Sequence, residues 1–144
     1  MYKKILVPLD GSPLAEAVLP HAEAIAKSEG AEIVILRVPA TPTAEYFARD
    51  PAIGESIRQD IEIEAKDYVN KAVDALKKDQ IRVTGIVQEG AVSETILAVA
   101  EETHADMIAM STHGRTGVSR WLMGSVADRV VHYAHIPVML IHPN

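Results

Sequence analysis

The order of strand-like and helix-like segments is the feature that most constrains the fold of this 144-residue chain. Short apolar runs, each the length of a buried strand, alternate with segments whose apolar residues recur at helical spacing. Such alternation predicts a parallel sheet with helices on both faces, because the connection between two parallel strands crosses over as a right-handed turn that carries a helix. We therefore expect an α/β fold, a three-layer, doubly wound open sheet of five parallel strands that is Rossmann-like in type. The expected strands are residues 3–9, 32–38, 81–87, 105–110 and 137–142.

The helical segments carry start and stop signals. Ser12 is a good N-cap with Pro13 at the first helical position, and Gly30 is a natural C-cap. Pro20 is expected to bend this first helix, since it removes one backbone hydrogen bond. The segment 39–51 contains three prolines and no clear period, which predicts a mobile loop. The other helices are expected at about 53–78, from Ser93 and at about 126–134, and the long one is expected to bury Ile57, Ile61, Ala65, Tyr68, Ala72 and Leu76.

Composition and charge exclude several classes of protein. The formal net charge is −6, whereas a nucleic-acid-binding protein needs a basic surface, so we expect no nucleic-acid partner. No apolar run is long enough to span a bilayer, and residues 1–4 lead directly into the first strand, so we expect no membrane association and no secretory signal. The chain has no cysteine, which excludes disulfides and thiolate zinc sites. These features predict a cytoplasmic protein, and the absence of a linker or repeat predicts a single domain over residues 1–144.

The stretch 110–125 contains the residues best suited to bind a ligand. It connects the fourth expected strand to the last expected helix and holds three glycines and two arginines. A strand that ends in such a loop and re-enters a helix presents several backbone N–H groups beside the positive end of the helix dipole, which suits a phosphate group. Ser125 is expected to cap that helix, with Asp128 completing a capping box. The alternative is a flexible connection, but the spacing of the whole stretch favours the phosphate.

The spacing Ser111-x2-Gly114-x9-Gly124-Ser125 resembles the G-x2-G-x9-G-[S/T] nucleotide motif of the universal stress protein family. Ser111 stands in place of the first glycine of that motif, where a serine is expected to crowd the ribose or to hydrogen-bond it. The resemblance also implies that the first and fourth strands are neighbours, which would bring their carboxyl ends to one crevice. Two further segments resemble the family, so that the resemblance covers the whole chain: residues 4–12 and residues 136–141.

The resemblance implies a nucleotide pocket built from residues far apart in the sequence. Asp10 has its family counterpart in that pocket, although a strand-end aspartate also caps helices and forms Asx turns, and the two roles weigh evenly. Val38 resembles the position that packs near the adenine, and it is expected in the core as well. The backbone N–H groups of Gly114, Gly124 and Ser125 are expected to hold the phosphates. The residues expected to bind the nucleotide are Pro8, Asp10, Val38, Met110, Ser111, Gly114, Gly124, Ser125, Val126 and Ala127.

The resemblance implies a stress-response switch or sensor that binds ATP, or AMP in its place, with Mg²⁺ held through the phosphates. Two alternatives stay open, a nucleotide-independent dimeric adaptor of the same fold and a slow ATPase. Dedicated catalysis is the least favoured, because the candidate groups Asp10 and His113 form no recognised catalytic set, and no catalytic or metal-binding side chain is predicted. The resemblance further implies a homodimer formed by antiparallel pairing of the last strand, residues 138–142, whose apolar edge would otherwise be exposed.

Overall fold

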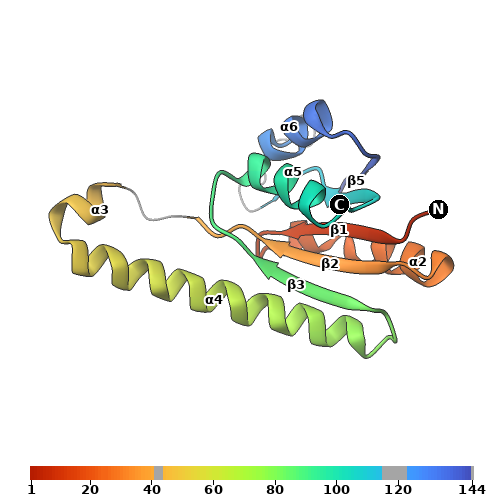
Figure 1. Cartoon of the computed structure of the whole chain (residues 1–144), viewed down its shortest axis with the longest axis horizontal. Helices are drawn as coiled ribbons and strands as arrows, with labels where there is room; N and C mark the ends of the chain where they lie inside the picture. The colour runs from red at the N-terminus through yellow and green to blue at the C-terminus, as the bar shows by residue number, and fades with distance from the viewer. Residues whose placement is uncertain (41–43, 115–122, 144) are drawn as a thin grey trace.

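The computed structural model describes residues 1–40, 44–114 and 123–143, and over these ranges strands and helices alternate as the sequence predicts (Figure 1). The part of the glycine-rich stretch at 115–122, with both of its arginines, therefore lies outside the described residues. The elements are β1 (Lys4–Leu9), α1 (Pro13–Glu16), α2 (Leu19–Glu29), β2 (Glu32–Arg37), α3 (Ala44–Arg49), α4 (Pro51–Lys77), β3 (Val83–Val87), α5 (Val92–Glu102), β4 (Met107–Ser111), α6 (Ser125–Tyr133) and β5 (Val138–Ile141).

The five strands run parallel in one sheet, in the order β3-β2-β1-β4-β5. β1 pairs with β2 on one side and with β4 on the other, where Ile5 lies opposite Met107. The chain thus builds the sheet outward from β1 in one direction and then returns to add β4 and β5 on the other side. The carboxyl ends of β1 and β4 lie where this direction reverses, which is where open α/β sheets bind their ligands. The predicted fold class and the predicted pairing of the first and fourth strands are confirmed.

Helices cover both faces of the sheet, and each face has its own apolar core. Figure 1 shows α4 on one side of the sheet and α5 and α6 on the other. Val7 and Ile35 belong to the first core together with Val69 of α4, whereas Leu6 and Leu36 belong to the second. Successive residues of a strand point to opposite faces, so a strand between two helical layers buries both of its sides. Burying one such side chain contributes ~1.5–3 kcal/mol, and this burial holds the strand ends that carry the site in place.

The first expected helix is divided in two rather than bent. α1 ends at Glu16, and α2 begins three residues later with Pro20 in its first turn. Pro20 lacks the N–H that would continue a single helix from the carbonyl of Glu16. Both expected caps are confirmed, because the Ser12 Oγ accepts a hydrogen bond from the Ala15 N–H at 3.2 Å and Gly30 ends α2 with a φ of 68°.

The expected loop over residues 39–51 is largely helical, so that prediction is wrong. α3 and the start of α4 occupy most of this segment, and Asp50 caps α4 by accepting a hydrogen bond from the Ala52 N–H at 3.0 Å. α3 packs against α4 where Gly54 makes room for a ring, since a Cβ on Gly54 would lie 2.6 Å from the Phe47 Cδ1. α3 has only 6 residues, which is too short for a periodic pattern that the sequence could display.

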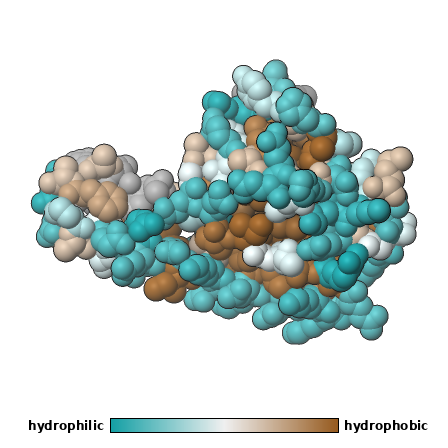
Figure 2. Space-filling model, in the orientation of Figure 1, coloured by the Kyte–Doolittle hydropathy of each residue, from teal (hydrophilic) through white to brown (hydrophobic). Residues whose placement is uncertain are grey.

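The apolar face of α4 is only partly the one expected. Ala65 and Leu76 are buried as predicted, but Val69 and Val73 are buried there too. The reason lies in β3, because Gly85 has no side chain and Val69 fills the space that a Cβ would take. Figure 2 shows hydrophobic residues gathered in the middle of the visible face, between α4 and the α5–α6 layer, and hydrophilic residues along the outer side of α4. The other expected members of the stripe are half-buried: Ile57, Ile61, Tyr68 and Ala72.

Candidate functional site

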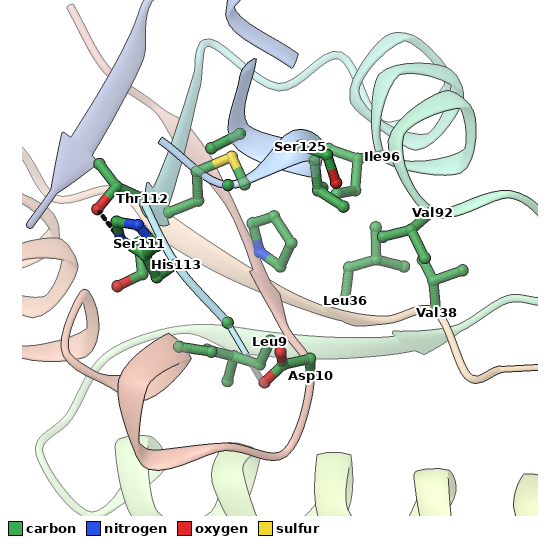
Figure 3. A pocket seen from close by; sticks show the side chains of 17 residues that line it. Leu9, Asp10, Leu36, Val38, Val92, Ile96, Ser111, Thr112, His113 and Ser125 are labelled. Carbon is green, nitrogen blue, oxygen red and sulfur yellow. Dashed lines mark hydrogen bonds between the residues drawn. The ribbon is translucent and has the colours of Figure 1, made fainter. Parts of the chain in front are cut away.

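A cavity of about 330 Å³ opens at the carboxyl ends of β1 and β4 (Figure 3). Its volume falls in the range of small-molecule sites, ~300–1,000 Å³. Every residue that the sequence predicts for the site lines this cavity: Pro8, Asp10, Val38, Met110, Ser111, Gly114, Gly124, Ser125, Val126 and Ala127. The lining residues that the predicted set omits are Leu9, Ala15, Leu36, Val92, Ile96, Thr112 and His113.

One side of the cavity is apolar. Figure 3 shows Leu36, Val38 and Val92 close together, with Ile96 above them. They lie away from the polar side chains at and just after the end of β4, Ser111, Thr112 and His113. Val92 is 40% exposed although it is a large apolar residue, which places it at the mouth of the cavity. Such a wall suits the flat face of an aromatic ring. Val92 and Ile96 escape the sequence analysis because the packing of α5 over the sheet, not a local motif, brings them to β2.

Asp10 makes the local turn that the sequence allows, and it also lies at the cavity. Its Oδ1 accepts hydrogen bonds from the Ser12 N–H at 2.9 Å and from the Ser12 Oγ at 2.6 Å, which makes the Asx-type turn into α1. Its carboxylate also lines the cavity. The Oδ2 lies directly against Gly114, so that a Cβ on Gly114 would collide with it. Gly114 thus lets the β4 connection approach the β1–α1 turn closely enough for both to form one wall.

Replacing Gly114 by alanine is expected to push the Asp10 carboxylate away and to break its hydrogen bonds to Ser12. The cost of such overpacking is ~1–3 kcal/mol in the free energy of unfolding, which urea denaturation measures. The double variant Gly114→Ala with Asp10→Ala is the control, because the methyl group then has space. Strictly additive losses in the two single variants and the double variant would contradict the proposed collision.

The start of α6 differs from the prediction. Gly124, not Ser125, is the N-cap, and no side chain within the described ranges caps this helix, so the capping box with Asp128 is wrong. The Gly124 N–H donates to the Thr112 carbonyl oxygen at 2.8 Å, which draws Gly124 into the cap position. Its N–H is therefore occupied and does not point at a ligand, which corrects its expected role in holding phosphate. The first helical hydrogen bond runs from the Asp128 N–H to the Gly124 carbonyl, so the N–H groups of residues 125–127 face out of the helix end.

Ser111 acts on the protein itself. Its Oγ donates a hydrogen bond to the Leu14 carbonyl oxygen in α1 at 2.7 Å, and the side chain is buried. The hydroxyl therefore has a partner within the protein, and its expected effect on a ribose stays a prediction. The serine instead ties the carboxyl end of β4 to α1, which is a contact that the glycine of the family motif has no atoms to make.

Two histidines meet around a hydroxyl group beside the cavity. The Thr112 Oγ1 lies 3.0 Å from the His113 Nδ1 and 3.1 Å from the His142 Nδ1, and the two rings make an edge-on contact with centroids 5.6 Å apart. A hydroxyl carries one proton, so it donates to one ring and accepts from the other. His113, which is buried, thereby joins the cavity wall to the chain just after β5. Among the described residues, no three His, Asp or Glu side chains gather as a metal site would require.

The arrangement as a whole combines an apolar wall, a carboxylate and an unblocked helix N-terminus. The family model of the Universal stress protein family matches residues 1–142. The chain belongs to the universal stress protein family. It is 35% identical over 143 residues to universal stress protein MJ0531 of Methanocaldococcus jannaschii. The aligned region covers 98% of this chain and 82% of that protein.

Solved universal stress proteins share the fold. The structure of MJ0577, also from Methanocaldococcus jannaschii, superposes with a TM-score of 0.88 at 29% identity and covers 100% of this chain and 98% of the other. UspA of Lactobacillus plantarum gives a TM-score of 0.85 at 26% identity, with 98% of each chain covered. Two more distant proteins of this fold were solved with nucleotides, one in complex with cAMP at 21% identity and one from Arabidopsis thaliana with AMP bound at 19% identity.

Proposed function

We propose that this universal stress protein binds ATP in the cavity at the carboxyl ends of β1 and β4, with Mg²⁺ held through the phosphates, and serves as a switch or sensor in the stress response. The observation that carries the proposal is that all the residues of the sequence motif line one cavity together with an apolar wall. Other proteins of this fold accommodate such ligands, since one was solved with cAMP and one with AMP. AMP is the nearest alternative ligand.

Each part of the cavity has a task in this proposal. The apolar wall of Leu36, Val38 and Val92 packs against the adenine. The N–H groups at the start of α6 and the positive end of its dipole hold the phosphates. Two positions are kept free of side chains, since a Cβ would meet the Asp10 carboxylate at Gly114 and the Thr112 carbonyl at Gly124. Backbone groups and shape, more than any one side chain, therefore bind the ligand.

Mass spectrometry of the nucleotide released from the purified protein tests the proposal most directly. ATP or AMP at a substantial fraction of the protein concentration is the expected result, and calorimetric titration of the emptied protein then gives the affinity. A protein that carries no nucleotide and gives no heat with ATP would instead be the nucleotide-independent adaptor. ATP turnover on the order of 1 per second or faster would make it a hydrolase.

Further proposals concern the assembly and location of the protein. We propose a homodimer formed through β5, which is the last strand of the sheet and has half-buried side chains along its length. We also propose a single domain over residues 1–144, and the cytoplasm as its location. No helix in the described ranges is long and apolar enough to cross a membrane.

Saturating ATP is expected to slow amide hydrogen exchange in residues 39–51 and 111–125. Val38 lines the cavity, and the chain continues from it into α3, so a ligand that fixes Val38 also restrains the start of this segment. A switch needs no more than a difference in ATP affinity between two states of the segment. Unchanged exchange across 39–51 at saturation would show that ATP does not act through it.

A further inference from the structure

The start of α5 forms part of the mouth of the cavity. Val92 is the first residue of α5 and is 40% exposed, whereas Ile96, one turn later, is buried against the sheet. Figure 3 shows Val92 beside Leu36 and Val38, with which it forms the apolar wall. The wall therefore combines side chains at the end of β2 with one at the end of a helix, and it is complete only if that helix end stays in place.

The local sequence shapes the start of α5 but does not anchor it. Ala91 is the N-cap, and no side chain in the described parts of the chain caps this helix. A helix end without such a cap leaves backbone N–H groups without a partner in the protein. The turn before it depends on Gly90, which has a φ of 145°, and a Cβ there would lie 2.5 Å from the Thr95 Oγ1. Contacts with other helices provide the anchor.

Two ion pairs join the start of α5 to two other helices. Just before α5, the Glu89 Oε1 accepts a hydrogen bond from the Arg58 Nε of α4 at 2.9 Å. In the first turn of α5, the Glu94 Oε1 accepts one from the Arg129 Nη2 of α6 at 2.7 Å. Val92 lies between these two glutamates in the sequence. The ion pairs therefore link the mouth of the cavity to α4 and to the helix proposed to hold the phosphates.

Arg58 reaches the mouth of the cavity because α4 extends past the sheet. Figure 1 shows α3 and the beginning of α4 beyond the carboxyl ends of the strands, the end of the sheet at which the cavity opens. Arg58 lies near the beginning of α4, where its Nη1 also donates to the Glu55 Oε1 at 3.1 Å. Arg58 and Glu89 are not among the described residues that line the cavity. An effect of this ion pair on the wall must therefore pass through the chain from Glu89 to Val92.

We propose that Arg58 is a positioning residue that acts through Glu89 to hold the start of α5, so that Val92 completes the apolar wall against the base of the ligand. This inference rests on the proposed binding of a nucleotide in the cavity. Because the wall faces the base, the loss of Arg58 should weaken adenosine and ATP by the same factor. A direct effect of its charge would instead grow with the number of phosphates and fall with added salt.

The test compares adenosine and ATP by calorimetric titration of variants on both sides of the ion pair. Arg58→Met and Glu89→Ala should each lower both affinities by about threefold, which is the scale of an exposed ion pair. The two substitutions change the net charge in opposite directions, so an equal loss in both cannot come from charge alone. The control is Lys66→Met, which removes the same charge as Arg58→Met. Lys66 pairs with Glu62 within α4 at 3.0 Å, so this control should leave both affinities unchanged.

Two further measurements test the positioning itself. Adding Glu89→Arg to Arg58→Glu re-forms the ion pair in reverse and should recover part of the affinity that Arg58→Glu alone loses. Methyl NMR of the protein without ligand reads the position of Val92 directly. The Val92 signals should shift in Arg58→Met and in Glu89→Ala but not in Lys66→Met. Val99, which is buried in the same helix, is the internal reference and should not shift.

The outcomes separate the two proposals. If the wild-type protein binds neither adenosine nor ATP, the proposed function is wrong and the role of Arg58 in binding is wrong with it. If it binds them but Arg58→Met behaves like Lys66→Met, only the role of Arg58 is overturned. A loss for ATP without a loss for adenosine, or opposite changes in Arg58→Met and Glu89→Ala, would also overturn it, because charge alone would then act. Equal losses for both ligands in both variants, with shifted Val92 signals, would establish the inference.

Discussion

Replacing Gly124 by aspartate is expected to abolish ATP binding. A Cβ on Gly124 would lie 2.8 Å from the Thr112 carbonyl oxygen, so any side chain there disturbs the hydrogen bond that sets the start of α6. Aspartate also adds a negative charge at the helix end proposed to hold the phosphates. Steric loss and repulsion together should cost several kcal/mol of binding free energy, on the scale of a buried charge left unpaired, ~3–5 kcal/mol. Calorimetric titration with ATP measures the loss.

Two control variants separate the steric contribution of the Cβ from the effect of the charge and test the contribution of a side chain. Gly124→Ala adds the Cβ without the charge and should give an intermediate loss. Arg115→Ala, outside the described residues, is expected to cost about 1 kcal/mol or less, the scale of a surface ion pair, because a site built from backbone groups depends little on one side chain. Loss of binding in Arg115→Ala together with normal binding in Gly124→Asp would contradict a site built from backbone groups. Circular dichroism of each variant confirms that α6 and the sheet are intact.

Replacing Leu140 by lysine is expected to convert the proposed dimer to monomers. β5 is the strand at one edge of the sheet. One side of β5 pairs with β4, where Leu140 lies opposite Met110, and the other side pairs with no strand among the described residues. An apolar edge of this kind is normally covered or paired in solution. The two-fold symmetry of a dimer would bury the lysine twice, once from each subunit, without a partner for its charge. Sedimentation velocity at micromolar concentration should show a dimer for the wild type and a monomer for the variant.

Lysine at the opposite edge of the sheet provides the matched control. Thr84 is exposed on β3, the other edge strand, so Thr84→Lys should leave the oligomeric state unchanged. A wild-type protein that sediments as a monomer would refute the dimer. A Leu140→Lys variant that stays dimeric while Thr84→Lys dissociates would place the interface at β3 instead.

Several elements of the fold follow from local sequence signals. The apolar strands and the helices between them determine the parallel sheet, because each crossover must be right-handed and each helix must bury one face. Ser12 and Gly30 cap their helices through hydrogen bonds within a few residues, so sequence alone locates them. Part of the cavity lining was predictable for a similar reason. Asp10 and Gly114 follow the ends of β1 and β4, and Ser111, Gly114, Gly124 and Ser125 belong to one spaced motif.

What the sequence alone could not determine depends on contacts between distant segments. The Thr112 carbonyl makes Gly124 the N-cap of α6, and Phe47 stabilises α3 only because Gly54 leaves space for its ring. The contacts of the buried Arg37 at the end of β2 with Glu64 and Tyr68 likewise require α4 to lie against the sheet. Local propensity and periodicity reflect hydrogen bonds and packing between residues a few positions apart. The contacts of Thr112 with Gly124, of Phe47 with Gly54 and of Arg37 with α4 join segments that the fold brings together. Local signals in the sequence thus determined the architecture and the strand ends that form the cavity, and the tertiary structure decided which backbone groups of the cavity are available and which apolar side chains complete its wall.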